Sequence, residues 1–132
     1  MKKIFTIIVL VLALSLILTA CGSNKVTLNV ISTDKGYDQP TYTVSAGKEV
    51  TLNLTNNGTT QHEFAVLKLG QHVEPPFGEK DEDKILWELD GVDPGTTKTD
   101  TFTAPTEPGE YDIICGIPGH IEQGMIATLI VK

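Results

Sequence analysis

The chain has 132 residues and a formal net charge of −7, with three histidines and two cysteines. This length allows one domain with a real hydrophobic core and is too short for two. The acidic balance argues against a nucleic-acid partner, because phosphates repel an acidic surface, and suits a basic protein partner.

The first twenty residues are typical of an export signal. Met1-Lys2-Lys3 is basic, and a nearly unbroken apolar run follows over residues 4–18. A membrane-spanning helix usually needs about 20 apolar residues, so an uncleaved membrane helix is the less favoured alternative.

The apolar run ends in Leu18-Thr19-Ala20-Cys21, which resembles the lipobox of bacterial lipoproteins. The resemblance implies a signal peptide over residues 1–20, cleavage before Cys21, and acylation of Cys21 by fatty acids such as palmitate. Residues 21–24 would then be a lipidated tether. Buried acyl chains would hold the protein on a bacterial membrane, outside the cytoplasm.

From residue 25 onward, apolar residues recur with a period of two, which is typical of β-strands with one buried face. The predicted strands cover residues 26–30, 41–46, 50–55, 61–67, 96–102, 110–115 and 125–131. Turn signals such as Ala46-Gly47-Lys48 and Asn56-Asn57-Gly58 separate neighbouring strands. Short strands at this spacing, with no long helical period, predict an all-β fold, an antiparallel β-sandwich over residues 25–132.

Residues 68–95 do not fit the alternating pattern. They contain a proline pair, a charged stretch over residues 79–84 and an apolar group made of Ile85, Leu86, Trp87 and Leu89. An insertion of this length is usually functional or partly helical, so we predict a short helix around residues 80–88. The charged stretch is better explained as a solvated face than as a binding patch.

Residues 115–125 carry three metal-binding side-chain types in one loop between two predicted strands. Cys115, His120 and Met125 follow the spacing C-x4-H-x4-M. Thiolate and imidazole suit copper, and a His2Cys plane with a weak axial Met is the geometry of blue-copper electron-transfer sites. Such a site needs a second histidine, which this loop lacks.

His62 and His72 are the two candidates for that ligand. His62 alternates with Phe64 and Val66 on a predicted strand, so its ring is expected to point inward. His72 lies in the irregular insertion, and we expect it to be a solvated surface histidine. Taken singly, a buried Cys, Met or His is more often a core residue. Their combination on one strand–loop–strand unit favours a metal site at His62, Cys115, His120 and Met125.

On these residues the chain resembles the cupredoxins, the small blue-copper family that includes plastocyanin, azurin and auracyanin. The resemblance covers about residues 25–132 and rests on His62-Glu63-Phe64 and on residues 108–112 and 115–125. It implies a Greek-key β-sandwich that binds one type 1 copper. By this resemblance His62 and His120 bind through Nδ1, Cys115 through its sulfur, and Met125 weakly along the axis.

One position departs from the family pattern. Many cupredoxins have Asn or Ser directly after the first histidine, where it helps to hold the copper loop. This chain has Glu63 there, and strand alternation predicts that its side chain points to the opposite face. Without Asn or Ser at this position, the usual hydrogen bond to the copper loop is not expected, and the reduction potential could differ from that of the family. The binding of copper by its four ligands does not depend on this position.

The predicted function is single-electron transfer by a membrane-tethered monomer that is not an enzyme. Four protein ligands leave no open coordination position, unlike catalytic metal sites. The resemblance implies that a redox partner, such as a cytochrome or an oxidase, docks at the ring edge of His120. The docking patch would include Ile117, Pro118 and Ile121.

The sequence is also compatible with two functions other than electron transfer. A copper-sequestering or copper-delivering lipoprotein would use the same ligands, and an adhesive β-sandwich would bind no metal. The dinuclear copper centre of respiratory oxidases needs two cysteines in this loop, and multicopper oxidases need more than the three histidines present. Both of these classes are excluded.

Overall fold

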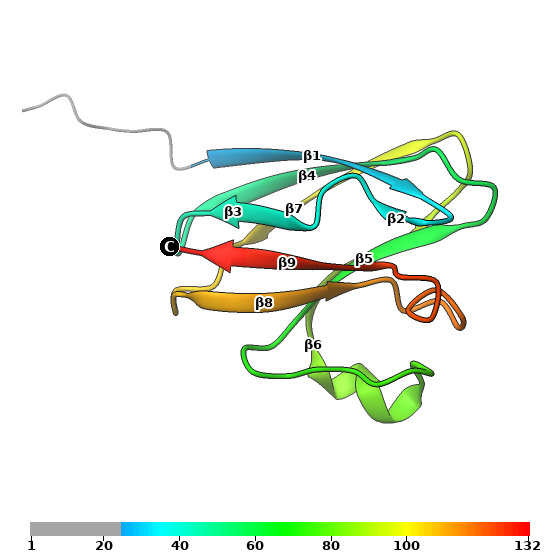
Figure 1. Cartoon of the computed structure of the whole chain (residues 1–132). Helices are drawn as coiled ribbons and strands as arrows, with labels where there is room; N and C mark the ends of the chain where they lie inside the picture. Colours follow the sequence, from blue (N-terminus) through cyan, green and yellow to red (C-terminus); the bar gives the residue numbers. More distant parts are fainter. Residues whose placement is uncertain (1–24) are drawn as a thin grey trace, which may run out of the picture.

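The computed structural model describes residues 25–132, which form two β-sheets packed face to face (Figure 1). The elements are β1 (Lys25–Thr33), β2 (Gly36–Tyr37), β3 (Thr41–Val44), β4 (Glu49–Asn56), β5 (His62–Leu67), the 3-10 helix η1 (Glu79–Lys84), β6 (Ile85–Val92), β7 (Thr97–Thr103), β8 (Gly109–Ile114) and β9 (Ile126–Val131). One sheet has the order β2-β1-β4-β7, and the other has the order β3-β9-β8-β5-β6. The predicted all-β sandwich is confirmed.

Alternate side chains of the strands fill the space between the two sheets. On β4, Val50, Leu52 and Leu54 are fully buried, and the residues between them are only partly covered. Phe64 on β5 and Leu129 on β9 belong to the same core cluster. Because successive side chains of a strand point to opposite faces, one apolar residue in two is enough to build this core.

Two strand pairs are parallel, so both sheets are mixed. β1 pairs with β4 in parallel, with Val26 opposite Val50, and β3 pairs with β9 in parallel, with Tyr42 opposite Leu129. Between β1 and β4 the chain crosses to the other sheet through β3, so no hairpin forces them to be antiparallel. The strictly antiparallel pairing predicted from the sequence does not hold for these two pairs.

The insertion contains a strand where the sequence analysis predicted a helix. Only the 3-10 helix η1 forms, supported by an ion pair of 2.8 Å between Lys84 Nζ and Asp81 Oδ1. The chain then continues as β6, which pairs with β5 at the edge of its sheet. The predicted helix is therefore wrong over residues 85–88, which belong to this strand. Trp87 and Leu89 pack in the main core, two residues apart, whereas Ile85 packs against a separate cluster that includes Leu67 and Ile114.

Three connections gather at one end of the sandwich, on the right in Figure 1. They are the β1–β2 turn, the β4–β5 connection and the β8–β9 loop. Gly36, with φ of 132°, opens β2, and a Cβ there would lie 3.3 Å from the carbonyl oxygen of Gly124 in the β8–β9 loop. The Asn57 N–H donates to the Ser32 carbonyl at 2.8 Å and ties the β4–β5 connection to β1. The three connections thus support one another.

Within residues 25–132, no helix is both long and apolar enough to cross a membrane. The predicted signal peptide, the acylated Cys21 and the tether lie outside the described residues. They stay predictions from the sequence.

We expect Leu54→Ala to lower the free energy of unfolding by about 2–5 kcal/mol, because it leaves a cavity in the core. Leu86→Ala is the matched control, since Leu86 is 46% exposed whereas Leu54 is 0% exposed. The control should change the free energy of unfolding by no more than about 0.5 kcal/mol. Urea denaturation followed by circular dichroism measures both values, and equal losses would contradict the core assignment.

Candidate metal centre

His62 opens β5, and its imidazole is fully buried at the end of the sandwich where the three connections meet. Its Nδ1 lies 3.3 Å from Nδ1 of His120. The preceding connection is held by Asn56, whose Nδ2 donates to the carbonyls of Thr60 and Val92, both at 2.8 Å. This bonding places the start of β5, and therefore His62, against the β8–β9 loop.

Cys115 directly follows β8 and is completely buried. Its Sγ lies 3.2 Å from Nδ1 of His120. Burial raises the pKa of the Cys115 thiol to about 11, while hydrogen bonds donated by the N–H groups of Ile117 and Glu63 oppose that rise. These two N–H groups favour the thiolate, and a bound cation would favour it much further.

The β8–β9 loop folds back on itself and brings its three predicted ligands together. The His120 carbonyl accepts from the Met125 N–H at 3.0 Å, and the Met125 carbonyl accepts from the Cys115 N–H at 3.2 Å. His120 is 8% exposed and Met125 is 1% exposed. Burial lowers the pKa of His120, and the neighbouring His62 lowers it further, so the His120 ring is neutral at pH 7.

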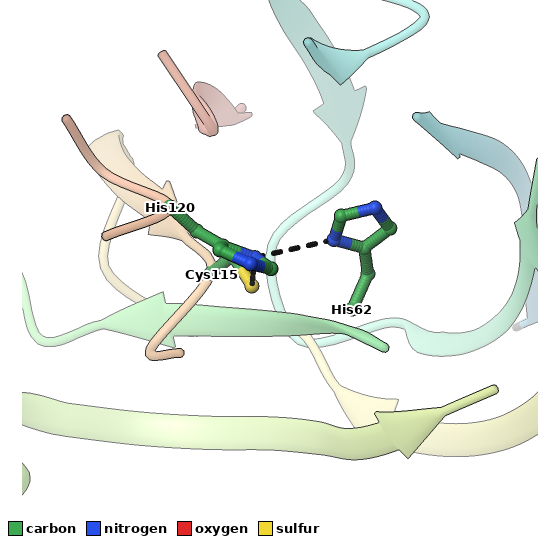
Figure 2. A group of neighbouring side chains, drawn as sticks. All are labelled: His62, Cys115 and His120. Atoms are coloured by element: carbon green, nitrogen blue, oxygen red, sulfur yellow. Dashed lines mark hydrogen bonds between the residues drawn. The ribbon is translucent and has the colours of Figure 1, made fainter. Parts of the chain in front are cut away.

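One donor atom each from His62, Cys115 and His120 lies within 4.8 Å of the others (Figure 2). Figure 2 shows the His62 ring on one side, facing the Cys115 sulfur and the His120 ring on the other. With metal–ligand bonds of about 2.0–2.3 Å in a trigonal plane, donors lie about 3.5–3.7 Å apart. The observed spacing and the N, N, S donor set therefore fit one copper ion.

The other candidate histidine lies elsewhere on the surface. The His72 side chain is 72% exposed, and its Nδ1 lies 2.7 Å from Oδ2 of Asp112. The prediction of a surface histidine is confirmed, and the sequence did not indicate its contact with the Asp112 carboxylate.

The predicted docking patch is smaller than expected. Pro118 is exposed and Ile117 is partly exposed. Ile121 is 4% exposed and packs in a second core cluster with Leu67 and Ile114. Placing Ile121 on the surface was wrong, because the loop turns this side chain inward against the sheet.

Glu63 contacts the loop in a way that the sequence analysis did not predict. Its N–H donates to the Cys115 sulfur, and its carboxylate accepts from the N–H of Gly116. Burial raises the pKa of the Glu63 carboxyl, and the nearby carboxylates of Glu88 and Asp90 raise it further. The side chain therefore links β5 to the residue after Cys115.

The Glu63 side chain reaches the loop from the face of β5 that lies opposite the main core. Phe64 packs in the main core, whereas Phe77, which lies beside the Glu63 carboxylate at Gly116, packs on the other face of the sheet. The register shift between His62 and Phe64 leaves this alternation intact, because two steps on β5 face three steps on β6, so the extra residue is on β6. Glu63 thus points to the face opposite His62, as alternation predicts, and the sequence did not indicate that it contacts the loop from there.

Asp34 is a further polar contact that the sequence analysis missed. It lies in the β1–β2 turn, and its Oδ1 is 3.2 Å from Nε2 of His62, 28 residues away in the chain. Turn residues of the type Asp-Lys-Gly are common, so the sequence around Asp34 indicates a turn but nothing about His62.

Comparison with known proteins agrees with this geometry. A model of the Cupredoxin-like domain matches residues 5–131. The copper-resistant cuproprotein CopI of Rubrivivax gelatinosus is 27% identical over an alignment of 112 positions that covers 78% of this chain and 64% of that protein. The chain thus spans less than two thirds of the length of CopI. Auracyanin-A of Chloroflexus aurantiacus is 28% identical over a gapped alignment of 138 positions that covers 82% of this chain and 85% of that protein.

Solved structures give the same result. The structure of auracyanin A from Chloroflexus aurantiacus, described as a "blue" copper protein, has a TM-score of 0.67 and 30% identity over 82% of this chain and 99% of that chain. Dithionite-reduced auracyanin from Roseiflexus castenholzii has a TM-score of 0.67 and 29% identity over 80% of this chain and 96% of that chain. The chain therefore belongs to the cupredoxin-like family and is a blue copper protein whose cofactor is one copper ion.

Proposed function

We propose that this protein carries single electrons between redox partners outside the cytoplasm, through a copper ion held by His62, Cys115, His120 and Met125. The observation that carries this proposal is the buried cluster of two imidazole nitrogens and one sulfur. It combines donors that suit both oxidation states of copper with a site from which water is excluded.

When bound, copper accepts and releases one electron. The chain contributes a site whose donor atoms barely move. Main-chain hydrogen bonds join Met125 to both Cys115 and His120, and His62 opens a paired strand. Because the ligands do not need to rearrange, the barrier that ligand movement would add to electron transfer is small.

Met125 completes the proposed ligand set. Its side chain is buried, and its main chain is hydrogen-bonded to the main chains of Cys115 and His120. A thioether is a weak, soft ligand that suits the axial position of such a site. With four protein ligands no position stays open for a substrate, which supports electron transfer rather than catalysis.

The proposal includes attachment to a membrane through an acylated Cys21. It is supported by the lipobox-like Leu18-Thr19-Ala20-Cys21. Residues 22–24 would then form a short polar link to the sandwich, which begins at Lys25. A tether of this kind would keep the carrier near membrane-bound redox partners.

Copper sequestration or delivery is the second candidate function. It is supported by the similarity to a protein named as a copper-resistant cuproprotein. Fast self-exchange of electrons with retained copper would favour the carrier. Ready transfer of copper to an acceptor protein would favour delivery.

We expect the purified chain to bind one copper(II) and to show an intense visible thiolate charge-transfer band, with narrow copper hyperfine splitting in electron paramagnetic resonance. Cys115→Ser should abolish the band, because the sulfur is its source. His72→Ala should keep it, since His72 lies on the surface. A wild-type chain without the band would overturn the proposed function.

Copper binding should release one proton per ion between pH 7 and 9. In the metal-free protein the Cys115 pKa is about 11, so the thiol is protonated there, whereas the His120 ring is already neutral. The ligand must lose its proton, so copper affinity should rise about tenfold per pH unit. Calorimetry in buffers of different ionisation enthalpy measures the proton count. Binding without proton release would argue against thiolate ligation.

Ile117→Glu should slow electron self-exchange about tenfold or more, because it places like charges opposite each other at the proposed docking patch. Leu86→Glu is the matched control, an exposed residue on β6 near the Leu67 end of β5, opposite from His62. Nuclear magnetic resonance of mixed oxidised and reduced protein measures the exchange rate. The colour should be unchanged in both variants, and equal exchange rates would rule out this docking face.

A further inference from the structure

The carboxylate of Asp34 is clamped by hydrogen bonds on both of its oxygens. The Thr59 N–H lies 2.9 Å from Oδ1 and 3.0 Å from Oδ2, and the Thr59 hydroxyl donates to Oδ2 at 2.8 Å. Thr60 donates its N–H and its hydroxyl to Oδ1 at 3.3 Å and 3.2 Å. Both oxygens of Asp34 thus accept hydrogen bonds from Thr59 and Thr60, an arrangement that suits an ionised carboxylate, which has acceptors only.

The clamped carboxylate also faces a proposed copper ligand. Asp34 Oδ1 lies 3.2 Å from Nε2 of His62, while Nδ1 of the same ring points to His120. An ionised carboxylate can only accept hydrogen bonds. Nε2 must therefore carry the ring proton, which leaves the Nδ1 lone pair free for a metal.

The backbone beside this contact leaves no room for a side chain. A Cβ on Gly58 would lie 2.5 Å from Asp34 Oδ1 and 2.6 Å from His62 Nε2. The φ angle of Gly58 is not in the left-handed region, so the constraint here is space rather than backbone conformation. Gly58, Thr59 and Thr60 thus hold the Asp34 carboxylate in place next to Nε2 of His62.

We propose that Asp34 is a positioning residue of the copper centre, which fixes the tautomer and orientation of His62 and places a negative charge behind it. The effect on copper rests on the proposed function, whereas the contact with His62 does not. The β1–β2 turn would thus support a site whose proposed ligands all come from other segments.

The charge of Asp34 should lower the reduction potential. Copper(II) carries one more positive charge than copper(I), so a nearby carboxylate stabilises the oxidised form more. The Asp34 side chain is 36% exposed, so water screens its charge. We therefore expect removal of this charge to lower copper(II) affinity only about tenfold, at the low end of the losses seen when residues that support metal ligands are changed. A tenfold loss of copper(II) affinity relative to copper(I) raises the potential by about 59 mV.

The first experiment tests the contact without any metal. In nuclear magnetic resonance of the copper-free full chain, we expect His62 to carry its proton on Nε2 in slow exchange with water. Asp34→Ala and Gly58→Ala should each lose this protected proton. Gly78→Ala, where a Cβ meets nothing within 4 Å, should keep it. A protected Nε2 proton that survives Asp34→Ala, or a wild-type proton on Nδ1, would overturn the inference.

The second experiment tests the consequence for copper. Asp34→Asn should keep the charge-transfer band, lose copper(II) affinity about tenfold and raise the reduction potential. Glu122→Gln removes an equal charge from an exposed position of the β8–β9 loop and should shift the potential less. A shift no larger than this control would refute the role of Asp34 in tuning copper. A missing band in the wild type would sink the proposed function instead, while the proton measurement still decides the contact.

Discussion

The metal centre depends on the hydrogen bonds that join the start of β5 to the end of β8. The N–H groups of Glu63 and Ile117 point at the Cys115 sulfur, and the Glu63 carboxylate holds the N–H of Gly116. These bonds bring a sulfur from one strand end beside an imidazole from another. These bonds oppose the preference for a neutral thiol that burial creates but do not overcome it, so bound copper would complete formation of the thiolate.

The sandwich makes this arrangement possible by fixing where strands end. β5 and β8 are antiparallel neighbours, with Ala65 opposite Ile114, so the beginning of one lies beside the end of the other. His62 and Cys115 occupy these two positions, and the β8–β9 loop returns His120 and Met125 to the same place. The apolar core between the sheets holds the strand ends in register. The packing of this core therefore restricts the movement of the donor atoms.

Two acidic side chains lie next to residues of the proposed copper site. Asp34 contacts the far nitrogen of His62, and Glu63 contacts the residue after Cys115. Both carboxylates would stabilise the more positively charged form of the site. The two carboxylates differ in environment. Asp34 accepts several hydrogen bonds near solvent, whereas Glu63 is partly buried, which raises the pKa of its carboxyl. Both carboxylates would therefore lower the reduction potential of the proposed site, compared with a site supported by neutral amides.

The sequence by itself determined the sandwich class, through its period of two, and the three proposed loop ligands, because C-x4-H-x4-M is a local pattern. It also favoured His62 over His72, since alternation shows which histidine faces the core. The tertiary structure decided the parallel pairs, the strand β6, the inward turn of Ile121, and the contacts of Asp34 and Glu63. The physical reason is that these features depend on where distant segments meet and on the bulge in β6. Local patterns of hydrophobicity contain no information about either.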